Sequence, residues 1–440
     1  MKQPGETIDF IRGLAWADVP AQVRARIGLL LRDFVAVSLA GRATPTARIA
    51  AEYAADEHRG DGATALFDGS RLSATGAAWA NGVLANALDF DDGHRLVKGH
   101  PGANVIPAAL ASAETAGANL EEFLAAVAAG YEVAIRAGIA LHGRSTDYHA
   151  SGAWGGVGAA SASARLLGLG ATETAHALGL VEYHAPIAPV MRSVADPAMT
   201  KDACGQGAWL GISSARMAKR GFTATASTFL NESAACDLGE RWRVLETYVK
   251  KFPCCRWSHP AIEAALGLHH ELGLDSERIS GVRVTTFSAA AALSRRHPTT
   301  TEEAQYSLVW PVAASLARGR FGIDEVLPAA FEDPAAACLK SLIDVEVDAG
   351  FDEAFPGRRL GRVSVECAGR RYGSDVTEAP GDPEDPGWEE IVQDKFECYA
   401  SSVPPRDVAR DETLSSQGID GLLSLLAGAG QQASYSDGVE

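Results

Sequence analysis

Ionisable side chains are concentrated between Asp89 and His100, where three aspartates and two histidines fall within twelve residues. Apolar residues flank this segment on both sides. Burying so many ionisable groups is costly unless they are paired or used in chemistry. A carboxylate beside an imidazole can transfer protons near neutral pH, so the segment is a candidate acid–base site. A solvated helix end followed by a His-Pro-Gly turn explains the same residue types equally well.

The same cluster could also hold a metal ion, because carboxylate and imidazole are suitable ligands for manganese or zinc. Other cofactor patterns are absent from the sequence: there is no Gly-x-Gly-x-x-Gly, no phosphate-binding loop and no calcium-loop pattern. The seven cysteines include no Cys-x-x-Cys pair. A metal-dependent enzyme that uses the Asp and His cluster therefore stays open as an alternative.

The first 240 residues are predicted to form successive helices that position this cluster. One of them begins at Asn119, which forms a capping pair with Glu122, and apolar residues then recur at helical spacing. Glu132 and Arg136 lie four residues apart and are predicted to form a structural side-chain pair. Pro101 disfavours helix at the residue before it, so His100 is expected at the start of a helix.

The pattern changes after about residue 270. Residues 279–287 and 360–367 alternate with strand period, 370–372 could continue the second strand, and the segments 304–318 and 323–330 indicate helices. Proline and glycine in 378–388 indicate a linker, and helix returns from Ile391. The expected fold class is mainly α. One helical domain comprises residues 1–265 plus 392–440, and a smaller α+β domain comprises 266–391.

Size and charge narrow the function classes. A chain of 440 residues usually forms two domains, and its net charge of −17 disfavours nucleic acid and anionic membranes as partners. The first residues contain no signal-peptide pattern, and no uninterrupted apolar run is long enough to span a membrane. The odd, scattered cysteines fit a reducing compartment. A cytoplasmic location is therefore expected.

Several motifs resemble those of one family. Residues 87–92 read Ala-Leu-Asp-Phe-Asp-Asp, and a short loop leads from them to His-Pro-Gly at 100–102. Further matches, in the family's order, are the segments 130–136, 148–160, 201–205 and 250–261, and a weaker one is 380–388. Together they cover most of the chain, which thus resembles the MmgE/PrpD family of 2-methylcitrate dehydratases, cis-aconitate decarboxylases and iminodisuccinate epimerases.

This resemblance implies a large helical domain built from both ends of the chain, with the α+β segment as a lid. It also implies a homodimer and a site between the domains that needs no cofactor. The substrate would be a small carboxylate, and the first chemical demand would be to stabilise negative charge next to a carboxylate group. A lyase of the dehydratase or decarboxylase type is expected.

Catalytic residues are implied by motif position. His100 and His149 are expected to be the proton-transfer pair, and Asp89 would orient or tune one imidazole. Lys201 and Lys250 would hold the substrate carboxylates and stabilise the developing charge.

The resemblance places further residues at the substrate, and two of them depart from the family pattern. Many members have threonine where this chain has Gly93, and tyrosine or phenylalanine where it has Trp310. The implied substrate-binding residues are Gly93, Lys251, Arg256, Tyr306 and Trp310, with His259 as a candidate helper. Neighbouring Cys254 and Cys255 are expected to be simply buried rather than nucleophilic.

Two more alternatives remain at this point. An epimerase of the iminodisuccinate type would use the same histidines and lysines. A catalytically inactive homologue that only binds a small molecule would be consistent with the changes at Gly93 and Trp310.

Overall fold

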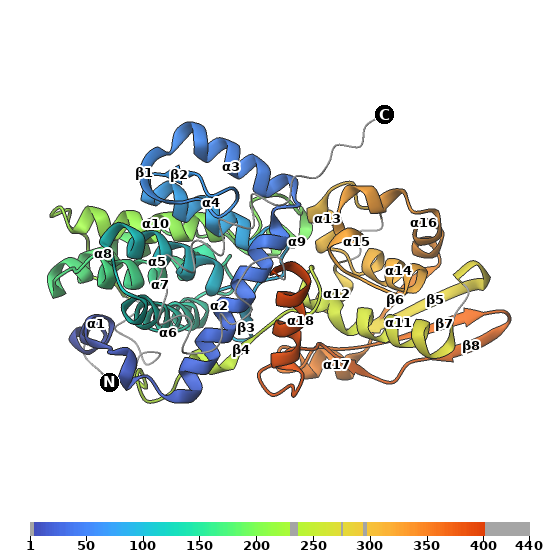
Figure 1. The fold of residues 1–440 in the computed structure, drawn as a ribbon. Coiled ribbons are helices and arrows are strands. Elements are labelled where there is room, and N and C mark those ends of the chain that lie inside the picture. The colour runs from blue at the N-terminus through green and yellow to red at the C-terminus, as the bar shows by residue number, and fades with distance from the viewer. Residues whose placement is uncertain (1–3, 229–235, 274–275, 294–296, 401–440) are drawn as a thin grey trace.

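A computed structural model describes residues 4–228, 236–273, 276–293 and 297–400. Residues 401–440, expected to belong to the helical domain, lie outside these ranges. Most of the described chain is helical, which confirms the mainly α class. Figure 1 shows the amino-terminal helices gathered at one end of the molecule, with the five-stranded sheet and its helices at the other.

The first part of the chain is a layered helical assembly in which α7 lies at the centre, packed against α5, α6, α8 and α10. Its helices are α1 (Pro4–Gly13), α2 (Ala21–Gly41), α3 (Pro45–Glu57), α4 (Ala74–Asn86), α5 (Gly102–Ala116), α6 (Leu120–Arg144), α7 (Gly152–Leu166), α8 (Ala171–His184), α9 (Met191–Ala195) and α10 (Cys204–Ala218). Short strands pair as β1 (Arg59–Thr64) with β2 (Arg71–Leu72) and as β3 (Gly93–His94) with β4 (Thr247–Tyr248).

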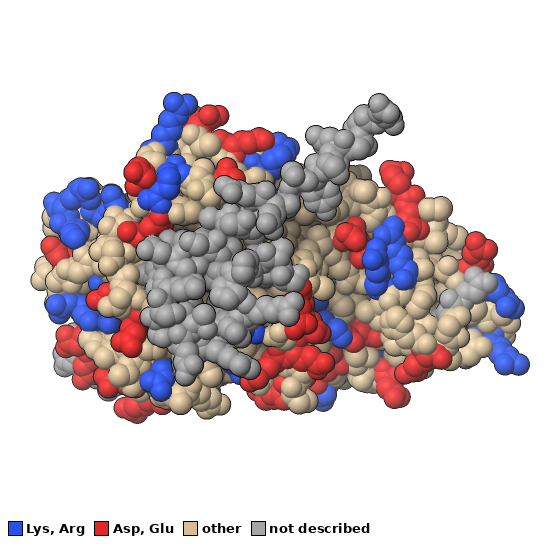
Figure 2. Space-filling model, viewed as in Figure 1, with Lys and Arg blue, Asp and Glu red and all other residues tan. Residues whose placement is uncertain are grey.

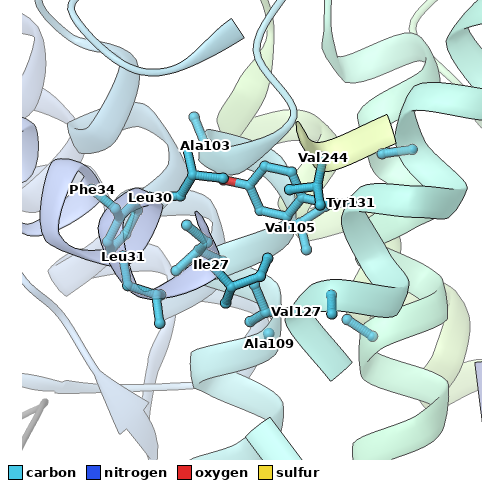
Figure 3. Packing of buried hydrophobic residues seen from close by; sticks show 14 of the residues in the cluster. Ile27, Leu30, Leu31, Phe34, Ala103, Val105, Ala109, Val127, Tyr131 and Val244 are labelled. Carbon is cyan, nitrogen blue, oxygen red and sulfur yellow. The ribbon is translucent and has the colours of Figure 1, made fainter. Parts of the chain in front are cut away.

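Glycines allow the close approach of α6 and α7. A Cβ at Gly158 would lie 2.3 Å from the carbonyl oxygen of Gly130 on α6, a distance that forces the two helices apart. The apolar faces on either side build the main core. Figure 3 shows Ile27, Phe34 and Tyr131 interdigitating within it.

The long helix α6 follows its sequence signals. Asn119 caps it and forms the predicted reciprocal pair with Glu122. Glu132 and Arg136 form the predicted ion pair, and Glu132 also accepts hydrogen bonds from the backbone of Arg243 and Val244. By length and composition α6 could cross a membrane, but 89% of its most apolar window is buried inside the protein, as expected of a core helix.

The second part contains a mixed sheet in the order β6-β5-β7-β8, with β9 added beside β7. The strands are β5 (Ile279–Thr286), β6 (Ile343–Val347), β7 (Leu360–Cys367), β8 (Arg370–Gly373) and β9 (Thr377–Glu378). The helices are α11 (His259–Leu272), α12 (Ser288–Ala291), α13 (Thr301–Gln305), α14 (Val309–Arg318), α15 (Ile323–Val326), α16 (Pro334–Ser341) and α17 (Ala349–Ala354). The strands expected near 279–287, 360–367 and 370–372 are thereby confirmed.

The final described helix, α18 (Trp388–Ala400), packs on α2. Its Trp388 and Phe396 join the main helical core. The boundary expected at residue 265 falls inside α11, whose apolar face packs against α14 and β7.

Charged residues of both signs are interspersed on the face drawn in Figure 2. Where described residues are visible there, Lys and Arg form no continuous basic surface. The absence of a basic surface on this face agrees with the composition of the chain, which has 56 acidic and 39 basic residues.

Candidate active site

A small cavity of about 50 Å³ lies where loops of the helical part meet the second part of the chain. Its lining combines acidic, basic and aromatic side chains. The lining residues are Asp89, Lys98, His100, Val190, Val194, Asp202, Tyr248, Lys250, Cys255, Arg256, Trp257, Tyr306 and Arg359.

His100 is the centre of a buried acid–base cluster. Its Nδ1 donates to the carbonyl oxygen of Asp92 at 2.9 Å and lies 3.2 Å from Oδ2 of Asp91. Its Nε2 lies 3.2 Å from Oδ1 of Asp89 and 4.0 Å from Oδ2 of Asp202. Burial alone would lower the pKa of His100, but Asp91 and Asp89 outweigh it, so the pKa is raised well above its ordinary value. His100 is therefore an imidazolium at neutral pH.

The backbone around His100 is fixed on both sides. Its N–H donates to Oγ of Ser151 at 2.9 Å, and its carbonyl accepts from the side chain of Asn104 at 2.8 Å. The following Pro101 leads directly into α5, as predicted from the sequence. These bonds hold the imidazole at the cavity wall.

Backbone strain is concentrated near the cavity. Asp89, Lys98, Lys201 and Ala203 all have positive φ, and Ala368 is the only other non-glycine residue with positive φ in the described ranges. Such conformations cost on the order of 1–3 kcal/mol each, and they persist where the surrounding structure enforces them.

Lys250 forms an ion pair with Asp89. Its Nζ lies 2.7 Å from Oδ1 of Asp89 and also donates to the carbonyl oxygen of the same residue at 2.7 Å. Burial would raise the pKa of Asp89, but Lys250 and the hydrogen bond from His100 outweigh it and lower the pKa. The pKa of Lys250 is raised, because Asp89 offsets the effect of burial. Both groups are thus charged.

Lys201 lies behind this pair rather than in the cavity wall. Its Nζ donates to the carbonyl oxygen of Ala87 at 3.1 Å and to Oε1 of Gln305. Burial lowers its pKa, and the charge of Asp89 partly offsets the effect. Sequence analysis predicted that Lys201 binds a substrate carboxylate, whereas the structure gives its ammonium a position from which it acts on Asp89.

Asp202, next in the chain, faces the cavity and His100. Its Oδ1 accepts from Oγ of Ser151 at 3.2 Å, and its Oδ2 accepts from the hydroxyl of Tyr306 at 3.1 Å. Burial and the charge of Asp202 raise the pKa of Tyr306 well above its ordinary value, so this phenol stays protonated. Tyr306 lines the cavity, and its contact with substrate stays a prediction.

Gly93 does not line the cavity itself, but its strand partner Tyr248 does. It pairs with Tyr248 between β3 and β4, and a Cβ at Gly93 would lie 2.4 Å from both Cζ and the hydroxyl oxygen of Tyr248. The guanidinium of Arg256 stacks 4.0 Å above the Tyr248 ring and is ion-paired with Asp382 at 2.9 Å. Tyr248 and Arg256 both line the cavity.

Two residues expected at the substrate lie elsewhere. Lys251 is half-exposed and ion-paired with Glu263 at 2.6 Å on the surface. Trp310 is fully buried in an apolar cluster, and its indole N–H donates to the carbonyl oxygen of Glu325 at 2.8 Å. Trp310 packs in the core and does not line this cavity, and its contact with substrate stays a prediction.

His149 is buried but is not part of the cavity lining. Its Nε2 lies 3.0 Å from Oγ of Ser145, and its backbone N–H donates to Nε2 of His142. In the described part of the chain no hydrogen bond or ion pair joins it to His100. The expected two-histidine pair is therefore not assembled in this conformation.

Asp89, His100 and Asp202 offer three potential metal-ligand atoms within 4.8 Å of one another. One of these carboxylates, however, already carries the ammonium of Lys250 at 2.7 Å. A divalent cation next to that ammonium would meet strong repulsion, and Nε2 of His100 would have to lose its proton. The residues therefore fit a metal-free acid–base site better than a metal centre.

Sequence reasoning missed four ionisable lining residues, which are Lys98, Asp202, Tyr248 and Arg359, and also the lining residues Val190, Val194 and Trp257. Asp202 lies in the motif 201–205, and Lys98 lies in the loop between the motifs 87–92 and 100–102. A charged residue within such a motif could have been predicted to line the site. Tyr248 and Arg359 carry no such local signal. Cys255 also lines the cavity, and burial with the charge of Asp89 raises its pKa to about 12, so its thiol is not a ready nucleophile.

Comparison with known proteins shows the family of this chain. Residues 6–238 match the MmgE/PrpD N-terminal domain, and residues 252–419 match the MmgE/PrpD C-terminal domain. The chain is 25% identical to a cis-aconitate decarboxylase-like protein of Aspergillus oryzae, with 90% of each chain covered. It is 22% identical to a cis-aconitate decarboxylase of Aspergillus terreus, with 90% of this chain and 89% of the other covered. The chain belongs to the MmgE/PrpD family.

Proposed function

We propose that this protein is a cofactor-independent lyase that acts on a small polycarboxylate, and that decarboxylation of cis-aconitate or a close analogue is its reaction. One observation carries the proposal: Nε2 of His100 lies 3.2 Å from Asp89 and 4.0 Å from Asp202 at the wall of a cavity that Lys250, Arg256 and Tyr306 also line. The relatives named cis-aconitate decarboxylase add support for the substrate.

The charge balance of the cavity suits a polyanionic substrate. Four cationic side chains besides His100 line it, namely Lys98, Lys250, Arg256 and Arg359, against the two carboxylates of Asp89 and Asp202. Loss of carbon dioxide leaves an electron pair on carbon next to a carboxylate group. Preorganised cations stabilise that charge where water is excluded.

In the proposed step, the π electron pair of the substrate's C=C bond takes the proton from Nε2 of His100 at the unsaturated CH carbon. The bond between the methylene carbon and its carboxylate breaks, and its electron pair forms the new C=C bond. Carbon dioxide leaves, one proton is consumed, and water restores the proton on His100. Asp89 and Asp91 hold the imidazole in position throughout.

Dehydration of a 2-methylcitrate-like substrate is the second candidate, because the same imidazolium could protonate a departing hydroxyl group. Epimerisation is less well supported. It needs acid–base groups on both faces of one carbon, and His149, the expected partner of His100, does not line the cavity.

A substrate panel tests the proposal. Purified protein is incubated separately with cis-aconitate, 2-methylcitrate and iminodisuccinate, and products are followed by mass spectrometry and by release of carbon dioxide. The expected result is release of carbon dioxide from cis-aconitate. Turnover of 2-methylcitrate alone would replace decarboxylation by dehydration, interconversion of iminodisuccinate enantiomers alone would replace the lyase by an epimerase, and no turnover of any acid would favour a binding protein.

A homodimer is part of the same proposal. Large apolar side chains are exposed around an apolar groove between α3, α4 and α10, among them Ile49, Tyr53 and Met199. Exposed apolar patches of this kind typically mark association surfaces. Light scattering at micromolar concentration tests it: twice the chain mass of 46.0 kDa is expected, and a monomer would contradict the proposal.

A further inference from the structure

Two cations at the cavity form no salt bridge with a carboxylate among the described residues. Arg359 is 2% exposed, and its Nε and Nη1 have no hydrogen-bond acceptor in the described part of the chain. Lys98 is half-buried, and its Nζ lies 3.6 Å above the ring of Tyr148 and 4.7 Å from that of Phe355. Within residues 4–228, 236–273, 276–293 and 297–400, no ion pair involves either side chain.

The other cations near the cavity are already neutralised. Lys250 is paired with Asp89, and Arg256 is paired with Asp382. Even Arg358, the exposed neighbour of Arg359, forms a salt bridge with Glu378 at 2.7 Å. Arg359 lies 5.7 Å from the centre of the Tyr248 ring and differs from its neighbours in being buried without a salt bridge in the described part of the chain.

Burying an unpaired guanidinium is costly, and a second cation nearby increases the cost. Lys98 and Arg359 interact unfavourably, since the charge of Arg359 contributes to lowering the pKa of Lys98. Burial, with a contribution from Arg256, lowers the pKa of Arg359 to about 10, so it remains charged at neutral pH. An anion between the two side chains would remove both penalties at once.

We propose that Lys98 and Arg359 form a carboxylate-binding pair that recognises a substrate carboxylate other than the one next to the reacting carbon. This inference rests on the proposed function and adds two residues that determine specificity for a polycarboxylate over a monocarboxylate. The planar guanidinium offers two parallel N–H donors to a carboxylate, and Lys98 adds a single charge.

The two side chains come from different parts of the chain. Lys98 lies in the loop that leads to His100, and Arg359 directly precedes β7. Tyr148 and Phe355 pack on either side of the Lys98 ammonium, the first from the helical part and the second from the segment before Arg359. A carboxylate bound here therefore contacts both parts of the protein. Its binding can be measured with an unreactive ligand, without turnover.

Tricarballylate is a suitable probe, because it has three carboxylates but neither the double bond of cis-aconitate nor a hydroxyl group to lose. Its affinity is measured by titration calorimetry for wild type, Lys98→Met and Arg359→Met. Loss of a charge-assisted hydrogen bond should weaken binding by about 10- to 100-fold for each variant. Arg359→Lys should recover only part of the affinity, because an ammonium lacks the fork of donors.

Arg358→Gln is the matched control, since it removes an adjacent arginine that pairs on the surface, and its affinity should equal that of wild type. Butyrate, with one carboxylate, should bind weakly and with the same affinity in wild type and Arg359→Met. Unchanged tricarballylate affinity in folded Arg359→Met, or no binding to wild type, would overturn the inference.

These outcomes are separable from those of the substrate panel. If no acid is turned over but tricarballylate binding depends on Arg359, the proposed lyase reaction fails and the carboxylate pair stands. If cis-aconitate is decarboxylated with the same KM by wild type and Arg359→Met, the reaction stands and the pair fails.

Discussion

The phenol ring of Tyr248 fills the space into which any side chain at position 93 would project. A Cβ at Gly93 would lie 2.4 Å from the ring, and both residues belong to the two-stranded pairing of β3 with β4. Tyr248, which lines the cavity, thus occupies the space that a side chain at position 93 would need.

Gly93→Thr should therefore destabilise the protein more than a typical substitution at the surface does. We expect a loss of about 1–3 kcal/mol in unfolding free energy, because overpacking forces Tyr248 to move. The loss of unfolding free energy in the double variant Gly93→Thr, Tyr248→Ala should be smaller than the sum of the losses in the two single variants. Denaturant unfolding of the single and double variants measures both effects, and additive losses in the double variant would contradict the coupling.

Binding of polycarboxylates should depend on pH through Lys98. Burial, together with the charge of Arg359, lowers the pKa of Lys98 to about 8. Lys98 is cationic below this pH and neutral above it, so the affinity for tricarballylate should be full near pH 7 and fall as the pH rises through 8. The other titratable groups facing it are Tyr148 and His142, and burial lowers the pKa of His142 to about 4, so it is neutral throughout this range.

Lys98→Arg provides the comparison, because arginine keeps its charge well above pH 8. Titration calorimetry from pH 6.5 to 9.5 should show an affinity that declines in wild type and stays nearly flat in Lys98→Arg. Parallel declines in the two proteins would assign the pH dependence to another group.

Trp310 should matter for stability and not for turnover. It is fully buried, and its indole donates to the carbonyl oxygen of Glu325. Trp310→Phe leaves that carbonyl unpaired and should cost about 1–3 kcal/mol in unfolding free energy. Steady-state kinetics below the melting transition should give wild-type kcat and KM. A changed KM with unchanged stability would instead place this residue in contact with substrate.

The sequence motifs predicted the acid–base cluster of the candidate site but not all of the residues that line the cavity. Asp89, His100 and Lys250 were identified from short segments rich in ionisable groups, and the structure brings them within direct contact. Tyr248 and Arg359 could not be identified in this way, because only the folded chain brings positions 89 and 359 to the same cavity.

A motif position does not specify where a side chain lies in the folded chain. Trp310 packs in an apolar cluster and His149 contacts Ser145 and His142, and neither residue lines the cavity. Strand alternation in 279–287 and 360–367 was reliable, because period-two patterns follow directly from which face is buried.

Chelation should leave activity unchanged. The ammonium of Lys250 lies 2.7 Å from Oδ1 of Asp89, so a divalent cation on that carboxylate would be repelled by it. Dialysis against EDTA followed by assay with cis-aconitate should give wild-type rates, and elemental analysis should show no stoichiometric metal. Zinc or manganese that leaves together with activity, and restores it on return, would establish the metal-dependent alternative.

The central claim is that the His100 imidazolium supplies the proton. The direct measurement is the rate of carbon dioxide release from cis-aconitate by wild type and by His100→Asn, whose amide can still donate to the carbonyl of Asp92; equal melting temperatures serve as the fold control. Loss of a positioned acid should reduce kcat by roughly 10²- to 10⁴-fold. A folded His100→Asn protein that releases carbon dioxide at nearly the wild-type rate would contradict this assignment.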